Sequence, residues 1–184
     1  MTRTRQHAPD RAPAAPPRRI VLTGFMGSGK STAGALLARQ LGSSFVDVDD
    51  VIEAEAGCAI AQIFAQQGEA AFREQERATI ARLAAGDNLV LALGGGAIED
   101  PATRRLLLNG GGTLLVHLEV ELATTLARCS GTEGTRPVLA DQANLAARYQ
   151  RRLPLYRQAH ASLHVDSLTP KQVVQAILRT ARLD

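Results

Sequence analysis

The chain has 184 residues, a hydrophobic fraction of 45% and a formal net charge of +3. This length suits one domain with a substantial core, and the composition is that of an ordinary globular protein rather than a fibrous or disordered one. No apolar run approaches the roughly 20 residues that a membrane-spanning helix needs, and the N-terminus has no signal-peptide segment, so we expect a cytoplasmic protein without a membrane partner.

The positive charge is concentrated at the N-terminus. Residues 1–19 contain five arginines against one aspartate, and the remainder is close to neutral. With only four Phe and two Tyr, little aromatic surface is available for stacking on bases, so nucleic acid is not an expected partner. Residues 1–18 are rich in Pro and Arg and are expected to form a disordered basic tail. Residues 19–184 are expected to form a single domain.

Beyond this tail, short apolar runs alternate with helix-like stretches, which is typical of an α/β fold with a mostly parallel sheet. Strands are predicted at residues 20–23, 44–48, 88–93, 113–118 and 162–166. These runs do not alternate in polarity, as expected for strands covered by helices on both faces. Helices are predicted at residues 30–41, 48–56, 60–67, 69–85, 101–108, 120–129, 142–159 and 170–183.

The segment GFMGSGKST at residues 24–32 follows the first predicted strand and opens the first predicted helix. It satisfies the pattern G-x-x-x-x-G-K-[ST], whose glycines let backbone N–H groups converge on phosphate oxygens at a helix N-terminus. Lys30, one of two lysines in the chain, supplies a compact ammonium where a planar guanidinium would fit less easily. The residues expected to bind a nucleoside triphosphate are Gly27, Ser28, Gly29, Lys30, Ser31 and Thr32. The alternative is a glycine-rich turn without a ligand.

The chain has no D-x-x-G or N-K-x-D motif of the GTPase type and no room for a second ATPase domain, so a small-molecule kinase is favoured. Asp47 and Asp49 lie two residues apart at the end of the second predicted strand, at the sheet edge where ligands bind in open α/β folds. One carboxylate could hold the water shell of Mg²⁺ while the other orients or deprotonates an acceptor hydroxyl. The alternative is that Asp47 and Asp49 cap the helix that follows, and helix capping is the role expected of Asp50.

A second glycine cluster, Gly94, Gly95 and Gly96, follows the third predicted strand. Three consecutive glycines allow the backbone to approach a bound ligand closely. A tight turn between a strand and a helix is the alternative explanation, and the sequence pattern alone does not decide between them.

Three arginines are candidates for binding anionic groups. Arg73 is spaced three residues from Glu76 on one predicted helix, so an ion pair can hold its guanidinium. Arg136 lies in the Gly-, Ser- and Thr-rich segment 130–140, which is predicted to be a mobile lid. Arg152 lies on a late helix. Each taken singly could instead be a solvated surface arginine.

Six ordered motifs together resemble those of the shikimate kinase family. They are, in chain order, G-x-x-G-S-G-K-S-T, D-V-D, G-E-x-x-F-R-x-x-E, G-G-G-A, T-R-P-V-L and R-x-P-L-Y. The resemblance runs over about residues 20–183. It implies a three-layer α/β/α P-loop fold with a five-stranded parallel sheet in the order 2-3-1-4-5, a mobile lid and shikimate-binding helices at about residues 50–85. The implied reaction transfers the ATP γ-phosphoryl group to the 3-hydroxyl of shikimate, a step towards chorismate and the aromatic amino acids.

The resemblance also implies roles for single residues. Asp49 binds shikimate hydroxyls and is the candidate base, while Arg73 and Arg152 bind the shikimate carboxylate. Arg136 approaches the ATP phosphates and acts with Lys30 in catalysis. Gly95, with its neighbours Gly94 and Gly96, gives a backbone contact, and Phe64 and Phe72 line the pocket. Ser31 binds Mg²⁺, and Asp47, from its position at the end of the second predicted strand, is expected to bind the metal through water.

Some features depart from the family pattern or stay open. A family arginine that precedes the lid falls here on Cys129, with Arg128 one residue earlier, so the nucleotide role of Arg128 is not assigned. The rival functions are a related P-loop kinase for another polyol acid such as gluconate, and a nucleotide-binding regulatory module. A monomer is expected, because no heptad pattern is present.

Overall fold

The computed structural model describes residues 16–129 and 142–183. The elements, in chain order, are β1 (Arg19–Thr23), α1 (Lys30–Leu41), β2 (Ser44–Asp47), α2 (Val48–Ala56), α3 (Ile60–Leu83), β3 (Leu89–Ala92), the 3₁₀ helix η1 (Ala97–Glu99), α4 (Pro101–Asn109), β4 (Thr113–Glu119), α5 (Leu122–Cys129), α6 (Gln142–Tyr156), β5 (Ala161–His164) and α7 (Pro170–Ala181). The predicted lid at residues 130–140, with Arg136, lies outside the described residues, as does most of the predicted tail.

The five strands form one parallel sheet in the order β2-β3-β1-β4-β5, which confirms the predicted topology. The central strand β1 pairs with β3 and β4, and every one of its residues is buried. This burial explains why its sequence shows no polar alternation. Because all strands run the same way, the segments that follow β1, β2 and β3 emerge at the same edge of the sheet.

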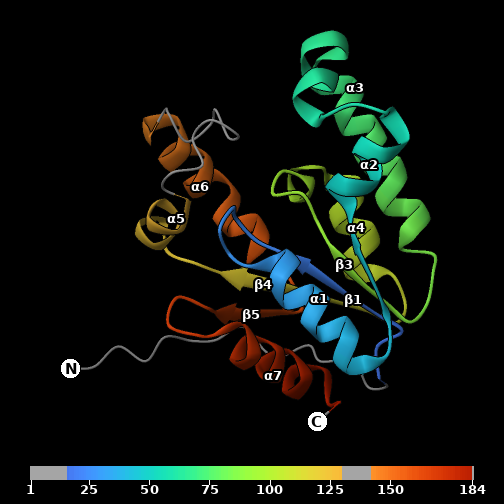
Figure 1. The fold of residues 1–184 in the computed structure, drawn as a ribbon, viewed down its shortest axis with the longest axis vertical. Helices are drawn as coiled ribbons and strands as arrows, with labels where there is room; N and C mark the ends of the chain where they lie inside the picture. Colours follow the sequence, from blue (N-terminus) through green and yellow to red (C-terminus); the bar gives the residue numbers. More distant parts are fainter. Residues whose placement is uncertain (1–15, 130–141, 184) are drawn as a thin grey trace.

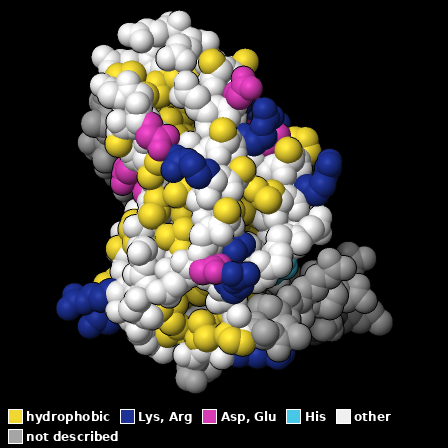
Figure 2. Space-filling model, turned by 90° about the vertical axis from the view of Figure 1, so that its right-hand side faces the viewer, with side chains coloured by type: hydrophobic (Ala, Val, Ile, Leu, Met, Phe, Trp, Pro, Cys, Tyr) yellow, Lys and Arg dark blue, Asp and Glu magenta, His cyan; other side chains and the backbone are white. Residues whose placement is uncertain are grey.

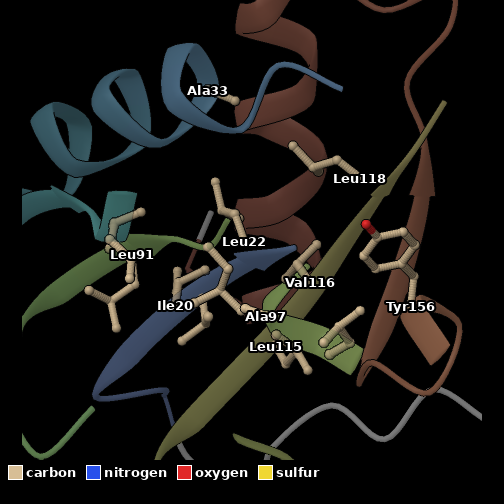
Figure 3. Packing of buried hydrophobic residues seen from close by; sticks show 14 of the residues in the cluster. Ile20, Leu22, Ala33, Leu91, Ala97, Leu115, Val116, Leu118 and Tyr156 are labelled. Carbon is tan, nitrogen blue, oxygen red and sulfur yellow. The ribbon is translucent and has the colours of Figure 1, made fainter. Parts of the chain in front are cut away.

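Helices lie on both faces of the sheet, as Figure 1 shows. The helices α1 and α7 pack against each other on one face, and α4 packs behind β4 on the other. The pair α2 and α3 and the pair α5 and α6 extend beyond the sheet on opposite sides (Figure 1). Apolar side chains of the strands, such as Leu22, Leu91 and Val116, fill the space between these layers (Figure 3).

Most predicted boundaries are met within one or two residues, and the exceptions have local causes. The helix α3 contains a break at Gly68, whose φ of 81° and ψ of 168° are not helical, so two predicted helices meet there. The strand β4 extends to Glu119, because the Glu119 carbonyl accepts a hydrogen bond from the Val165 amide. The helix α5 therefore starts at Leu122 rather than at residue 120. The helix α6 ends at Tyr156, three residues earlier than predicted.

The surface in Figure 2 carries acidic and basic side chains scattered among apolar ones, without a continuous basic patch on that face. Leu36 and Leu106 are the large apolar side chains that are exposed among the described residues. No helix within residues 16–129 and 142–183 has both the length and the apolar character needed to cross a bilayer.

Candidate active site

The residues predicted to bind ligands come together in a cleft of about 760 Å³ at the carboxyl edge of the sheet. The predicted residues that line it are Gly27, Gly29, Lys30, Ser31, Thr32, Asp47, Asp49, Phe64, Phe72, Arg73, Gly94, Gly95, Gly96 and Arg152. The side chain of Ser28 is instead buried. Arg136 lies outside the described residues.

The side of the cleft that is predicted to bind phosphate is the loop between β1 and α1, and the shape of this loop depends on Gly24. The φ of Gly24 is 149°, and a Cβ at this position would lie 2.5 Å from the carbonyl oxygen of Leu118. Only glycine fits such an approach. The ammonium of Lys30 donates hydrogen bonds back to the carbonyls of Gly24 and Phe25, at 2.8 and 3.1 Å. These contacts hold Lys30 at the N-terminus of α1, where anions bind.

On the same side of the cleft, the Ser31 hydroxyl donates a hydrogen bond to the Asp47 carboxylate, with Ser31 Oγ 2.7 Å from Asp47 Oδ2. The other oxygen of Asp47 accepts from the Asp49 amide at 3.2 Å and caps α2. Asp47 therefore has both the capping contact and the contact with Ser31. A hydroxyl and a carboxylate are hard oxygen ligands of the kind that Mg²⁺ uses together with water and substrate phosphates, so this pair fits the metal.

Asp49 lies between the phosphate side and the opposite wall of the cleft. Burial, and then the nearby carboxylate of Asp47, raise the pKa of Asp49 to about 6, although Lys30 opposes this shift. A Cβ on Gly94 would come within 2.6 Å of Asp49 Oδ1 and 2.9 Å of Glu76 Oε1. The glycine at this position therefore leaves room for two carboxylates to approach the same backbone.

Arg73 is held by two carboxylates of its own helix. Its Nη1 donates to Glu76 Oε2 at 2.7 Å, and its Nη2 lies 3.1 Å from Glu69 Oε1. The predicted pairing of Arg73 with Glu76 is confirmed. Glu76 is 2% exposed, and burial raises its pKa although Arg73 opposes the shift. Its other oxygen has no hydrogen-bond partner within the described residues.

The apolar part of this wall comes from Phe64 and Phe72, whose ring centroids lie 4.7 Å apart. The guanidinium carbon of Arg73 lies 5.2 Å from the Phe72 ring centroid, within reach of a cation–π interaction. A Cβ on Gly96 would come within 2.5 Å of Arg73 Nη2. The glycine cluster therefore allows the functional side chains of both neighbouring segments to pack directly on the backbone.

Arg152 reaches the same wall from α6. Its side chain is 8% exposed and forms an ion pair with Glu99, with Nη2 2.6 Å from Oε2. Its Nη1 would lie 3.7 Å from a Cβ on Gly95. Arg73 and Arg152 thus line the space beyond the phosphate loop together with the carboxylates of Asp49 and Glu76, which is a suitable arrangement for an anionic molecule with hydroxyl groups.

The comparison with known proteins agrees with this geometry. Residues 26–182 match the family model for shikimate kinase. The chain belongs to the shikimate kinase family.

Individual relatives cover nearly the whole chain. The shikimate kinase of Salinibacter ruber is 42% identical over 161 residues, which cover 82% of this chain and 78% of that protein. The shikimate kinase of Persephonella marina is 39% identical over 166 residues, 90% of this chain and 99% of that protein. The structure of shikimate kinase from Acinetobacter baumannii in complex with shikimate matches with a TM-score of 0.82 at 33% identity, covering 92% of this chain and 93% of that one.

Within this shikimate kinase fold, two further arginines line the cleft: Arg148, which the sequence did not single out, and Arg128, whose nucleotide role it left unassigned. Arg148 also lines it, four residues before Arg152 on α6, and this helical spacing could have revealed it. Arg128 donates to the carbonyls of Gly27, Val165 and Asp166 at 3.0 to 3.1 Å. It therefore ties the phosphate loop to the segment after β5, a long-range contact that no sequence pattern indicates.

A buried aromatic stack supports the glycine cluster of this shikimate kinase family member. The ring of Tyr156 stacks on His117, with centroids 5.0 Å apart and planes 19° apart, and its hydroxyl donates to the Gly95 carbonyl. Figure 3 shows Tyr156 beside β4, where the Tyr156 ring is part of the buried core. Burial lowers the pKa of His117 to about 4, although Glu119 opposes the shift. His117 is therefore neutral at physiological pH.

Proposed function

We propose that this chain transfers the γ-phosphoryl group of ATP to the 3-hydroxyl of shikimate, giving shikimate 3-phosphate. The observation that carries the proposal is the position of Asp49, which lies in one cleft with the Lys30 loop and with two arginines. Family membership and the structural likeness to a shikimate complex support the acceptor.

On the nucleotide side, the backbone from Gly27 to Thr32 would bind the phosphates, and Lys30 would offset charge on the transferring group. Ser31 and Asp47 would hold Mg²⁺, Asp47 through water; the metal, when bound, neutralises phosphate charge. Arg136 would approach the phosphates when the lid closes and excludes water.

On the acceptor side, Arg73 and Arg152 would bind the shikimate carboxylate, since paired guanidiniums suit a carboxylate. Gly95 would contact the substrate through its backbone, and Phe64 and Phe72 would pack against the ring. Asp49 would orient the 3-hydroxyl and accept its proton as the bond to phosphorus forms. A carboxyl with a pKa raised to about 6 is a better proton acceptor than an ordinary aspartate.

Catalysis would then be mainly positioning and charge stabilisation for an in-line transfer. We also expect the enzyme to be a cytoplasmic monomer with ATP and shikimate as its partners. Sedimentation of the purified protein tests the monomer: a single species at the mass of one chain is expected, and a dimer would contradict it.

A coupled ADP-release assay with Mg-ATP tests the function, with shikimate, gluconate or no acceptor added. ADP release that depends on shikimate is expected. Release with gluconate alone would indicate a kinase for another polyol acid. Tight ATP binding without release in any mixture would indicate a regulatory module instead.

A further inference from the structure

Glu99 does not line the cleft, but it forms an ion pair with Arg152, which does. Its Oε2 lies 2.8 Å from Nε and 2.6 Å from Nη2 of Arg152. Its Oε1 accepts a hydrogen bond from Nε of Arg151 at 2.8 Å. Both oxygens of Glu99 are therefore engaged by neighbouring arginines of α6.

These contacts determine which edge of Arg152 remains for a ligand. A guanidinium is a rigid planar fork, so fixing Nε and Nη2 also fixes the direction of Nη1. That Nη1 is the atom that would lie 3.7 Å from a Cβ on Gly95, a residue of the cleft wall. Glu99 thus binds the edge of Arg152 formed by Nε and Nη2, and the remaining edge lies by Gly95, where the Tyr156 hydroxyl also interacts with the Arg152 side chain.

The backbone of Glu99 is fixed as well. Nη1 of Arg104 donates to the carbonyls of Ile98 and Glu99, at 2.7 and 2.9 Å. The Glu99 amide donates to the carbonyl of Gly96 at 2.9 Å. The turn that forms the glycine cluster therefore also carries the carboxylate that orients Arg152.

The charge balance of this group keeps Arg152 effective towards an anion. Glu99 is shared between Arg151 and Arg152, so the three side chains together keep one positive charge. Without a carboxylate partner, a guanidinium that is 8% exposed would be costly to bury. Glu99 removes this cost without neutralising the whole group, because Arg151 supplies the second positive charge.

We propose that Glu99 is a positioning residue for acceptor recognition, which holds Arg152 so that its Nη1 faces the carboxylate of the substrate. The inference rests on the proposed role of Arg152 in binding that carboxylate. Glu99 itself does not touch the substrate, and its effect is on affinity and not on the transfer step.

Steady-state kinetics of Glu99→Gln test this role, because the substitution keeps the size of the side chain and removes its charge. The KM for shikimate should rise about tenfold, while kcat and the KM for ATP change by less than about twofold. Glu55→Gln is the matched control, since the exposed Glu55 pairs with Arg82 and neither residue lines the cleft. It should leave all three constants unchanged. If Glu99→Gln does not fold, Glu99→Asp keeps the charge on a shorter side chain, and a smaller rise in the shikimate KM is expected.

The uncharged methyl ester of shikimate, used as a competing ligand, separates positioning from mere structural support. The wild type should prefer shikimate over the ester, Glu99→Gln should reduce this preference about tenfold, and Arg152→Ala should reduce it further, about thirtyfold, with Arg73 supplying what remains. A lower Tm of Glu99→Gln with an unchanged shikimate KM and unchanged preference would overturn the proposal. Full preference in Arg152→Ala would instead overturn the role of Arg152 and this inference with it. A wild type that does not phosphorylate shikimate would contradict the proposed function itself.

Discussion

The two sides of the cleft are built in different ways. The phosphate side is one continuous segment, residues 24–32, in which the loop after β1 and the N-terminus of α1 would provide the binding groups. The acceptor side combines side chains from separate segments, which are Asp49, the α3 residues around Arg73, the glycine cluster and Arg152. In the proposed function, phosphate would be recognised mainly by backbone, whereas the acceptor would be recognised mainly by ion-paired side chains. The first kind of site would fail when one glycine changes, and the second when a guanidinium or its carboxylate partner is lost.

The largest effect is expected at Asp49, which stands between the two sides. Asp49→Asn should lower kcat about a thousandfold, because the amide cannot accept the hydroxyl proton, while both substrates still bind. Burial raises the folded-state pKa of Asp49 from its ordinary 3.8 to about 6, so stability falls as the pH rises from about 4 to 6 and the full cost of ionisation is present at pH 7.5. The Tm of the ligand-free variant at pH 7.5 should therefore be no lower than that of the wild type. Normal turnover in this variant would exclude Asp49 as the base.

A change of one glycine tests the phosphate side. Gly24→Ala would place a methyl group 2.5 Å from the Leu118 carbonyl and distort the loop, so kcat/KM for ATP should fall about a hundredfold. Gly111→Ala is the matched control, because a Cβ there would have no atom within 4 Å among the described residues. Kinetics should be measured below the Tm of each variant. Equal effects of the two substitutions would argue against the geometric explanation.

Loss of one guanidinium tests the acceptor side. Arg152→Ala should raise the KM for shikimate about thirtyfold, the value of one charge-assisted contact with a carboxylate. The KM for ATP should stay within about twofold. Titration of shikimate at saturating ATP measures this directly, and an unchanged shikimate KM would remove Arg152 from the binding site.

The smallest effect concerns the stack behind the glycine cluster. The folded-state pKa of His117, about 4, lies below its ordinary 6.5, so the unfolded chain binds more protons and stability falls as the pH drops from 6.5 towards 4. The groups facing His117 are Glu119, Ser162, Arg157, His164 and Lys30. His117→Phe keeps a ring against Tyr156 and should reduce the loss of unfolding free energy between pH 6.5 and 5 by on the order of 1 kcal/mol. Denaturant unfolding at both pH values measures it, and equal losses in both proteins would contradict it.

The contrast between the two sides also explains what the sequence could predict. The phosphate loop is contiguous, so its pattern and its position between a strand and a helix identify it, and the apolar runs predict the sheet well. The pair Arg73–Glu76 follows from helical spacing. The partnership of Glu99 with Arg152 and that of Arg128 with the segment after β5 join residues 37 or more positions apart. Such contacts depend on how the helices pack against the sheet, and the local sequence pattern does not specify that packing.

The most direct test of independent phosphate and acceptor sides is to measure the KM for ATP and the KM for shikimate in each of two single variants, Gly24→Ala and Arg152→Ala. The structure predicts a crossed result, in which Gly24→Ala impairs ATP and leaves the shikimate KM within about threefold, whereas Arg152→Ala does the reverse. If either variant raised the KM for ATP and the KM for shikimate equally, the two sides of the cleft would not be independent, which would contradict the division into a phosphate side and an acceptor side.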